Sequence, residues 1–409
     1  MLNGPHRTLQ ALGILVYGFL MISSLNRLWW FLTRYGVAIG IACGMIMLVD
    51  IKAGEAREAP KASFQQALPG YTYTFPFDHG SHDTYMTEWW YFTGHLLTRN
   101  GRRFGYELTF FRRAIDDERV RTNPSPWALR QLYFAHLAVT DETKSRFHYA
   151  EKISRAALGK AGAETGHLQT WIDRWSVTTD PSHPHQFHLQ AFTKEFGINV
   201  TVVSHKFPAI HGHQGISRKG SARGQASHYY SLTRLETKGR VWVEDTKFDV
   251  KGTSWMDHEF GSVDLGKGLV GWDWFSIQLE TGQELMLYGL RRKDGSFDPV
   301  SSGTFVMADG SSQYLPLKVL QVEVLDHWVS PASGARYPSR WRLTIPSLRM
   351  RLEIMPRLLN QELRTVKSTH VTYWEGAVDV SGTLGNVNVT GRGYVELTGY
   401  AKPFHPFSK

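Results

Sequence analysis

Hydrophobic and polar positions alternate in short runs along most of the chain, beginning near residue 71. The run from Glu88 to Leu96 is rich in aromatic residues that favour strands, and the turn signal Asn100-Gly101 and a return run over 104–111 follow it. Further strand-like runs lie at 131–140, 147–153, 167–178, 186–192 and 198–203. Only 155–163 has the composition of a short helix. Many short strands separated by turns are typical of a sandwich or barrel, so we expect an all-β fold.

The same pattern returns in the second half of the chain. The run from Trp272 to Leu279, the turn Thr281-Gly282 and the run 284–290 repeat the order of the first hairpin. A second echo is Arg340-Trp341, which resembles Arg174-Trp175. Two matches in the same order indicate a tandem duplication that gives two β units of similar plan. We assign these units to residues 59–262 and 263–409.

Two apolar stretches, 9–25 and 35–49, precede the β pattern, and basic residues precede each of them. The second stretch is typical of the apolar core of a signal peptide, and Gly54-Glu55-Ala56 places small residues at both positions that a signal peptidase inspects. The first stretch is explained either by a later start at Met21 or by a membrane hairpin with the second. We assign 1–58 to a signal peptide or membrane anchor with a linker, and we expect a protein that is periplasmic or anchored facing the periplasm.

The charge and the cysteine content limit the kinds of partner and site that the chain can have. The 409 residues carry a net charge of +9, but the Lys and Arg residues are scattered, so we expect no nucleic-acid partner. The chain has one cysteine, Cys43, which lies in the apolar N-terminal region. A disulfide framework and a Cys-ligated metal site are therefore excluded from the rest of the chain.

Histidines form two clusters in the sequence. They are His183, His185 and His188, and then His205, His211 and His213. Alternate spacing on a strand would bring two imidazoles to one face, where they could bind zinc. Both clusters lie beside prolines and glycines in expected loops, so we predict solvated loop histidines and no metal.

Two motif searches argue against other enzyme classes. No Gly-x-Ser-x-Gly occurs, so a hydrolase with a nucleophile elbow lacks its main signal. The segment 266–271 has the letters of a dinucleotide-binding motif, but it precedes a strand and does not open a helix. We expect no cofactor.

The candidate chemistry centres on the segment Trp255-Met256-Asp257-His258-Glu259-Phe260-Gly261. A carboxyl group among such apolar neighbours loses hydration, which raises its pKa and makes it a usable proton donor near neutral pH. His228 and Tyr230 are two residues apart on an expected strand, as are Trp255 and Asp257, so each pair shares a face. If these two strands pair or face each other, the four groups meet. The alternative is that Asp257 caps a turn and that the rings form an aromatic core.

We name as catalytic candidates Asp257, His228, Tyr230, Trp255 and His258. The first aromatic strand and its repeat supply candidates for ligand binding, because aromatic faces and an occasional polar group are typical of sites for hydrophobic ligands. These candidates are Glu88, Trp89, Tyr91, Trp272 and Asp273.

Three segments resemble a known family. They are 88–95 (Glu-Trp-Trp-Tyr-Phe-Thr-Gly-His), 255–261, and the closing pair Tyr373-Trp374-Glu375-Gly376 and Gly391-Arg392-Gly393-Tyr394. Over roughly residues 70 to 402 the chain resembles the carotenoid 1,2-hydratase / AttH-like family, whose members are often labelled hydroxyneurosporene synthase or predicted secreted hydrolase. The resemblance implies two tandem lipocalin-like antiparallel β-barrels. It also implies cofactor-free addition of water to a terminal isoprenoid double bond, or control of polyene cyclisation.

The resemblance also implies roles for single residues. His228-x-Tyr230 and Trp255-x-Asp257 lie where the hydratases carry a His-x-aromatic pair and an aromatic-x-Asp pair. Asp257 would then be the proton donor, His228 would support it, and Trp255 and Tyr230 would line the cation. Both aromatic positions differ in type from those of the hydratases, so a carotenoid is not the first substrate that we expect.

Together these observations predict an exported protein that binds a hydrophobic, isoprenoid-like or lipid-like small molecule. We favour cofactor-free, acid-catalysed hydration or isomerisation of a C=C bond, which is a hydro-lyase type of activity. The alternative is a non-enzymatic carrier or sensor of lipophilic molecules. A weaker alternative is the secreted hydrolase that the family label suggests.

Overall fold

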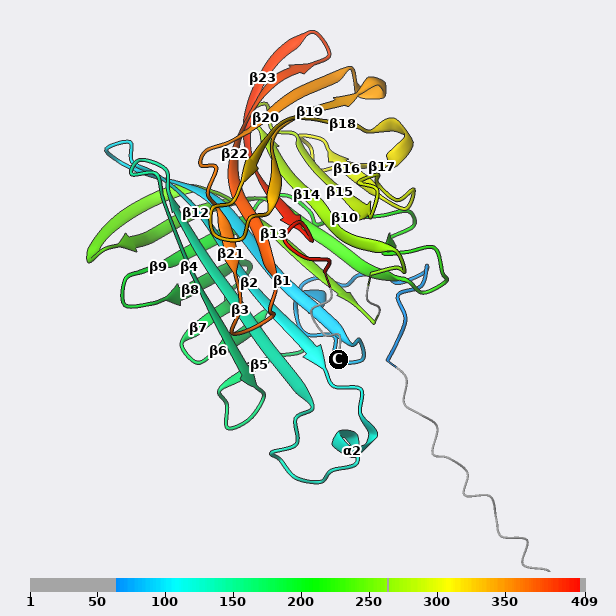
Figure 1. Ribbon diagram of the computed structural model, residues 1–409. Coiled ribbons are helices and arrows are strands. Elements are labelled where there is room, and N and C mark those ends of the chain that lie inside the picture. The colour runs from blue at the N-terminus through cyan, green and yellow to red at the C-terminus, as the bar shows by residue number, and fades with distance from the viewer. Residues whose placement is uncertain (1–63, 263–264, 405–409) are drawn as a thin grey trace, which may run out of the picture. The chain divides into compact units, whose positions relative to one another are not determined.

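The computed structural model describes residues 64–262 and 265–404 (Figure 1). The expected signal or anchor segment, its cleavage site and Cys43 lie outside these residues. Among the described residues, α-helix is limited to α2 (Glu118–Arg121), and three single turns are 3-10 helices: η1 (Phe77–His79), η2 (Leu317–Val319) and η3 (Pro346–Leu348). In this part of the chain, no helix has the length and apolar character that a membrane crossing requires.

The first antiparallel sheet is built from residues before 262. Its strands are β1 (Thr87–Thr98), β2 (Arg103–Ala114), β3 (Gln131–Asp141), β4 (Arg146–Arg155), β5 (Ala161–Ala163), β6 (Gln169–Ile172), β7 (Trp175–Asp180), β8 (His183–Phe192), β9 (Phe196–Ser204), β10 (Ala209–Ile210), β11 (Ser217–Arg218), β12 (Ala226–Val243) and β13 (Thr246–Gly261). The strand order is β4-β3-β2-β1-β13-β12-β9-β8-β7-β6-β5, and β10 and β11 pair with β12.

The second antiparallel sheet follows in the chain. Its strands are β14 (Leu269–Leu279), β15 (Glu284–Arg292), β16 (Ser302–Val306), β17 (Ser312–Pro316), β18 (Gln321–Val329), β19 (Arg336–Ile345), β20 (Met350–Pro356), β21 (Glu362–Arg364), β22 (Thr372–Leu384) and β23 (Val387–Thr398). The strand order is β17-β16-β15-β14-β23-β22-β20-β19-β18, and β21 pairs with β22.

One plan therefore occurs twice. In each sheet four successive strands form a meander, and the first of them pairs with the last strand of the sheet, β13 or β23. The prediction of an all-β protein with two curled antiparallel sheets is confirmed. The first of the two repeated patterns matches the structure, since β1 and β14 occupy equivalent positions in their sheets. The domain limits at 58/59 and 262/263 stay predictions.

Three local predictions are wrong. The run 167–178, predicted as one strand, forms β6 and β7 with a turn at residues 173–174 between them. Trp175 lies on β7 and Trp341 on β19, and these strands stand at different distances from the closing strands of their sheets, so the second echo is not part of the repeat. The expected helix over 155–163 consists of the last residue of β4, a turn over 156–160 and the short strand β5. Leu158 and Gly159 have φ angles of 54° and 67°, which a right-handed helix cannot contain.

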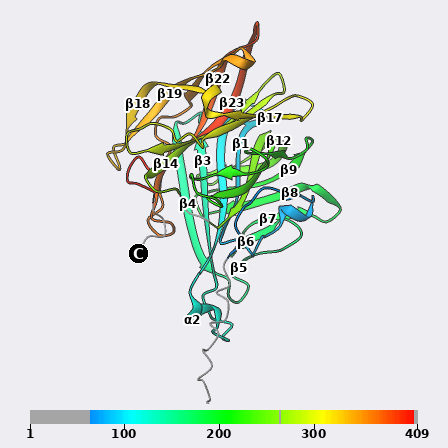
Figure 2. The same cartoon turned by 90° about the vertical axis from the view of Figure 1, so that its right-hand side faces the viewer.

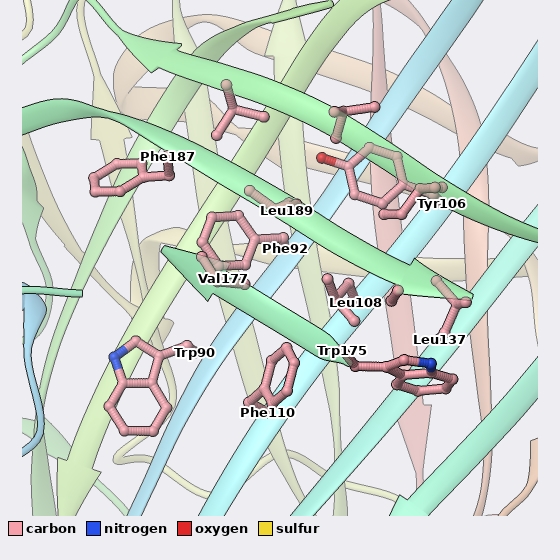
Figure 3. Close-up of a cluster of buried hydrophobic side chains, with 14 of the residues drawn as sticks. Trp90, Phe92, Tyr106, Leu108, Phe110, Leu137, Trp175, Val177, Phe187 and Leu189 are labelled. Atoms are coloured by element: carbon pink, nitrogen blue, oxygen red, sulfur yellow. The ribbon is translucent and has the colours of Figure 1, made fainter. Parts of the chain in front are cut away.

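The main core of the first sheet explains why β1 reads as an almost unbroken apolar run. Trp90 and Phe92 point into a cluster with β2, β3, β7 and β8 (Figure 3). The alternate residues Trp89 and Tyr91 point the other way and pack against Trp274 of the second sheet and its neighbours. Both faces of β1 are therefore covered, which favours continuous hydrophobicity over strict alternation.

Contacts between β1 and β23 and between β2 and β22 join the two sheets. The two views agree on this arrangement, because β22 and β23 lie beside β1 in each (Figure 1, Figure 2). The sheets thus meet through their central strands, which carry the candidate motifs of both halves.

An N-terminal arm, residues 64–86, covers the inward face of β12 and β13. Its Tyr71 ring lies 4.4 Å from the ring of His228, and Phe75 lies 4.9 Å from Tyr230, both measured between ring centroids. His82 stacks on Phe260 at 3.6 Å. This face of the first sheet is thus filled by aromatic rings of the arm.

Candidate functional site

A cavity of about 200 Å³ lies between the two sheets. Strands β1, β2, β12 and β13 form one wall, and β14, β15, β22 and β23 form the other. Four of the predicted residues line it, namely Asp257, Trp89, Tyr91 and Trp272. The walls are mainly apolar, with aromatic rings from both sheets, so the cavity suits a hydrophobic ligand.

Three side chains donate hydrogen bonds to the carboxyl group of Asp257, which lines this cavity. Its Oδ1 accepts a 2.6 Å hydrogen bond from the Trp255 indole and a short one from the Ser231 hydroxyl, and its Oδ2 accepts a 2.7 Å bond from the Tyr229 hydroxyl. Burial, which leaves the residue 3% exposed, raises the pKa of Asp257 to about 7, although the three donors act to lower it. Asp257 can therefore both hold and release a proton near neutral pH.

A second layer of polar groups orients these donors. The Trp274 indole donates to the Tyr229 hydroxyl at 3.0 Å. His211 Nε2 lies 2.5 Å from the Ser231 hydroxyl, and its Nδ1 lies 2.9 Å from the hydroxyl of Thr304 in the second sheet. Burial lowers the pKa of His211 to about 3, so its ring is neutral. The groups that hold Asp257 thus come from both sheets and from the loop before β12.

The expected meeting of His228 and Tyr230 with Asp257 is wrong. In the register of β12 with β13, Tyr230 pairs with His258, and Ser231 pairs with Asp257. Paired residues share a face, so Tyr230 and His258 point toward the arm and Asp257 points toward the cavity. The Tyr230 hydroxyl lies 2.7 Å from His79 Nδ1 and 3.0 Å from His258 Nδ1. Trp255, in contrast, does meet Asp257, as its spacing predicts.

Glu88 belongs to the network on the arm side and not to the cavity wall. His258 Nε2 and His82 Nδ1 each lie 2.8 Å from its Oε1, and the Arg112 guanidinium donates to its Oε2 at 3.0 Å. Although burial acts to raise the pKa of Glu88, Arg112 and the two histidines hold it well below its usual value.

The side chains of His82, Glu88 and His258 are close enough to hold a metal ion, since their ligand atoms lie within 4.8 Å of one another. They fit such an ion poorly. Arg112 already neutralises Glu88, and hydrogen bonds to Asp78 and Glu88 raise the pKa of His82 to about 9 despite its burial, so this ring is a cation. The group is an ion-pair network that fastens the arm to the sheet.

Asp273 is also away from the cavity. Its Oδ1 lies 2.7 Å from Arg291 Nη1, and the Tyr400 hydroxyl donates to both of its oxygens at 3.0 Å. It alternates with Trp272, which lines the cavity, so only one of the two neighbours can face a ligand there. A ligand-binding role for Trp89, Tyr91 and Trp272 stays a prediction.

The histidine clusters of the sequence do not assemble. The His183 and His205 side chains are about two-thirds exposed and contact Asp180 and Glu236. His211 is fully buried beside Ser231, so the prediction of a solvated loop histidine is wrong for this residue. Its buried hydroxyl partners lie far from it in the sequence, which explains why spacing alone gives no hint of them.

The sequence analysis assigned no role to four carboxyls that line the cavity, namely Glu107, Glu259, Glu375 and Glu396, although Glu259 lies within the central segment 255–261. Glu259 accepts from Ser227 and pairs with Lys219 at 2.5 Å. Burial raises the pKa of Glu396 to about 7 and that of Glu107 to about 8. Burial and the neighbouring carboxyls raise the pKa of Glu375 well above its usual value. The signal available in the sequence was a Glu within each aromatic strand, but not the face on which it lies.

Comparisons with known proteins agree with this architecture. The sequence profile of the AttH-like family matches residues 66–400. The crystal structure of a putative AttH from Nitrosomonas europaea is 32% identical, with a TM-score of 0.74, and the match covers 82% of this chain and 99% of that one. No curated protein matches the sequence.

Two more distant structures share the fold. Kievitone hydratase from Nectria haematococca is 14% identical with a TM-score of 0.64, and the match covers 84% of this chain and 98% of that one. CghA with Sch210972 is 12% identical with a TM-score of 0.52, and the match covers 83% and 97%. The family profile spans nearly all of the described residues, and the chain belongs to the AttH-like family.

Proposed function

We propose that this protein hydrates or isomerises a C=C bond of a hydrophobic ligand in the cavity between its sheets, with Asp257 as the proton donor. The observation that carries the proposal is the buried Asp257 carboxyl, held by three donors on an apolar cavity wall and with its pKa raised to about 7. A general acid works best when its pKa lies near the working pH. A relative of the same fold is named a hydratase, which fits this activity.

The reaction would begin with transfer of the Asp257 proton to one alkene carbon. The O–H bond breaks, a C–H bond forms, and the other carbon becomes a cation beside the Asp257 carboxylate. Trp89, Tyr91 and Trp272 line the cavity, and their rings would stabilise this cation by cation–π attraction. Attack by water and loss of its proton complete a hydration, whereas loss of a proton from a neighbouring carbon completes an isomerisation.

An isoprenoid is the substrate class that we favour, because a trisubstituted alkene gives a tertiary cation on protonation. The mainly apolar walls match such a ligand. We also propose that the protein acts after export, or anchored at the membrane, on the basis of the apolar segments before residue 58.

A hydrolase finds less support in the cavity. Ser231 is fully buried and its hydroxyl donates to Asp257, so the carboxyl holds it and it does not face the ligand. Ser227 lines the cavity but donates to Glu259. Ser231 has a neighbouring histidine, His211, but does not line the cavity, and Ser227 lines the cavity but bonds to Glu259 and not to a histidine. Nucleophilic catalysis requires both a base and a path to the ligand carbonyl.

The test is Asp257→Asn, assayed against a panel of isoprenoid and lipid alkenes, with products identified by mass spectrometry. We expect the variant to bind its ligands as the parent does but to lose turnover by about 100-fold or more, because the amide cannot donate a proton to carbon. Equal activity of the two proteins would show that Asp257 is not the acid. Binding across the panel without any turnover by the parent would favour the lipophilic carrier.

A further inference from the structure

Glu107 on β2 and Glu375 on β22 stand on opposite walls of the cavity, one from each sheet. Each is 1% exposed. The Thr109 hydroxyl makes a short hydrogen bond to Oε1 of Glu107, and the Tyr91 hydroxyl donates to Oε1 of Glu375 at 2.7 Å. Within residues 64–262 and 265–404, Oε2 of each has no hydrogen-bond partner.

Other carboxyls of the same cavity differ in this respect. Both oxygens of Asp257 accept hydrogen bonds. Both oxygens of Glu396 do so too, from the Trp272 indole at 3.1 Å and from the Thr398 hydroxyl at 3.0 Å. Leaving a buried carboxyl oxygen without a partner is costly, so two such atoms in one cavity indicate a site for a ligand group that supplies the missing hydrogen bonds.

We propose that Glu107 and Glu375 form a second polar subsite of the cavity, which binds the oxygen of the adding water or of a tertiary alcohol and takes up the proton that this water loses. The inference rests on the hydration proposed above and assigns its base.

The chemistry of the pair suits this task. Glu375 pairs across the strands with Glu396, and the charge of Glu107 also acts on it, so these carboxyls cannot all ionise together. With one member protonated and the other ionised, the two residues present one O–H donor and one carboxylate acceptor to a water or hydroxyl oxygen in the cavity.

The step balances with Asp257 on the other side of the alkene. Asp257 gives its proton to one carbon, the water oxygen bonds to the cationic carbon, and an O–H bond of that water breaks as its proton passes to the ionised member of the pair. A proton returned to Asp257 from solvent, and one lost by the pair, close the cycle.

Tyr91 lies between the proposed acid, Asp257, and the proposed base. On β1 it pairs in register with Asp257 of β13 and with Thr109 of β2, so the three lie in one row across the first sheet. Neighbouring strands are about 4.8 Å apart, which puts the Asp257 and Thr109 backbones about 10 Å from each other.

The test compares 2-methyl-2-heptene with its hydration product, 2-methyl-2-heptanol, and measures binding through the emission of the cavity tryptophans. We expect the double variant Glu107→Met/Glu375→Met to lower the affinity for the alcohol, relative to the affinity for the alkene, by roughly tenfold. The reason is that the hydroxyl of the alcohol loses its hydrogen-bond partners. The matched control is Glu396→Met, which removes a partly buried carboxyl of the same cavity whose two oxygens both accept hydrogen bonds. This control should leave the ratio of the two affinities near that of the parent. Each single Met variant should shift the ratio in the same direction and serves if the double variant does not fold.

An unchanged ratio in the folded variants, or an equal shift in the Glu396→Met control, would overturn the subsite. Asp257→Asn separates this inference from the proposed reaction, because the subsite predicts that this variant keeps the parent ratio. If Asp257→Asn retains full turnover while the Glu variants shift the ratio, the acid is wrong and the subsite stands. If Asp257→Asn loses turnover and the ratio never shifts, the acid stands and the subsite is wrong.

Discussion

Tyr229 and Tyr230 are neighbours in the chain but serve opposite faces of β12. Tyr229 donates to Asp257, and Tyr230 contacts His79 and His258 on the arm side. Tyr229→Phe should raise the pKa of Asp257 further, because a bond that favours the carboxylate is lost, and the alkaline limb of the pH–rate profile should move to higher pH. Tyr230→Phe should leave the profile in place and cost about 1–2 kcal/mol of stability. Equal shifts in both variants would contradict the placement of these rings.

Single residues show what the sequence could and could not predict about the site. The spacing of Trp255 and Asp257 within one strand correctly placed them together, because a two-residue repeat needs no knowledge of other strands. To predict whether His228 and Tyr230 meet Asp257, one must know the register between β12 and β13. A shift of one residue in that register reverses every face, and no local signal fixes it here.

At the scale of elements, the strands themselves were predictable and their packing was not. Aromatic and β-branched runs predicted β1, β2 and β14 near their observed bounds, and the shared hairpin pattern predicted the repeat. Runs apolar on both faces carry no signal for which face meets the other sheet. The cavity therefore could not be predicted, and neither could the glutamates Glu107 and Glu375 that line it.

The contact of β2 with the second sheet can be tested through Gly105. A Cβ built at Gly105 would lie 3.0 Å from Cβ of Ala377, on β22, and even closer to the hydroxyl of Tyr394, on β23. Gly105→Val should therefore push the sheets apart, lower the free energy of unfolding by about 1–3 kcal/mol and weaken ligand binding in the cavity. Gly105→Ala should have a smaller effect of the same sign. Urea unfolding measures the free energy of unfolding, and tryptophan emission measures ligand binding. A Gly105→Val variant that changes neither quantity would contradict the close approach of the two sheets.

At the scale of the whole molecule, the meeting of two duplicated sheets concentrates buried carboxyls. Asp257 comes from the first sheet and Glu375 and Glu396 come from the second, and burial raises the pKa of all three. Because burial opposes the ionisation of these carboxyls, they make the folded state less stable once the pH exceeds their pKa values in the unfolded chain. They therefore reduce stability at neutral pH. This cost is what a site for acid–base chemistry at neutral pH would require.

The same groups predict how stability depends on pH. Between about pH 6.5 and 9 the folded state holds protons that the unfolded chain has released, because the pKa values of Asp257, Glu107 and His82 are raised to about 7, 8 and 9. The free energy of unfolding must then fall as pH rises, by about 1.4 kcal/mol per held proton and pH unit. Buried His211, with a pKa lowered to about 3, acts in the opposite direction, but only below about pH 6.5.

The measurement is the urea midpoint at several pH values across this window. We expect it to fall steadily from pH 6.5 to 9 in the parent protein. Glu107→Gln, which cannot ionise, should flatten the slope because one held proton is removed from the balance. A slope unchanged in Glu107→Gln would mean that Glu107 does not hold a proton in the folded state. A midpoint that rises over this range would mean that the buried groups as a whole are not protonated there, and the proton donor proposed for the cavity would lose its physical basis.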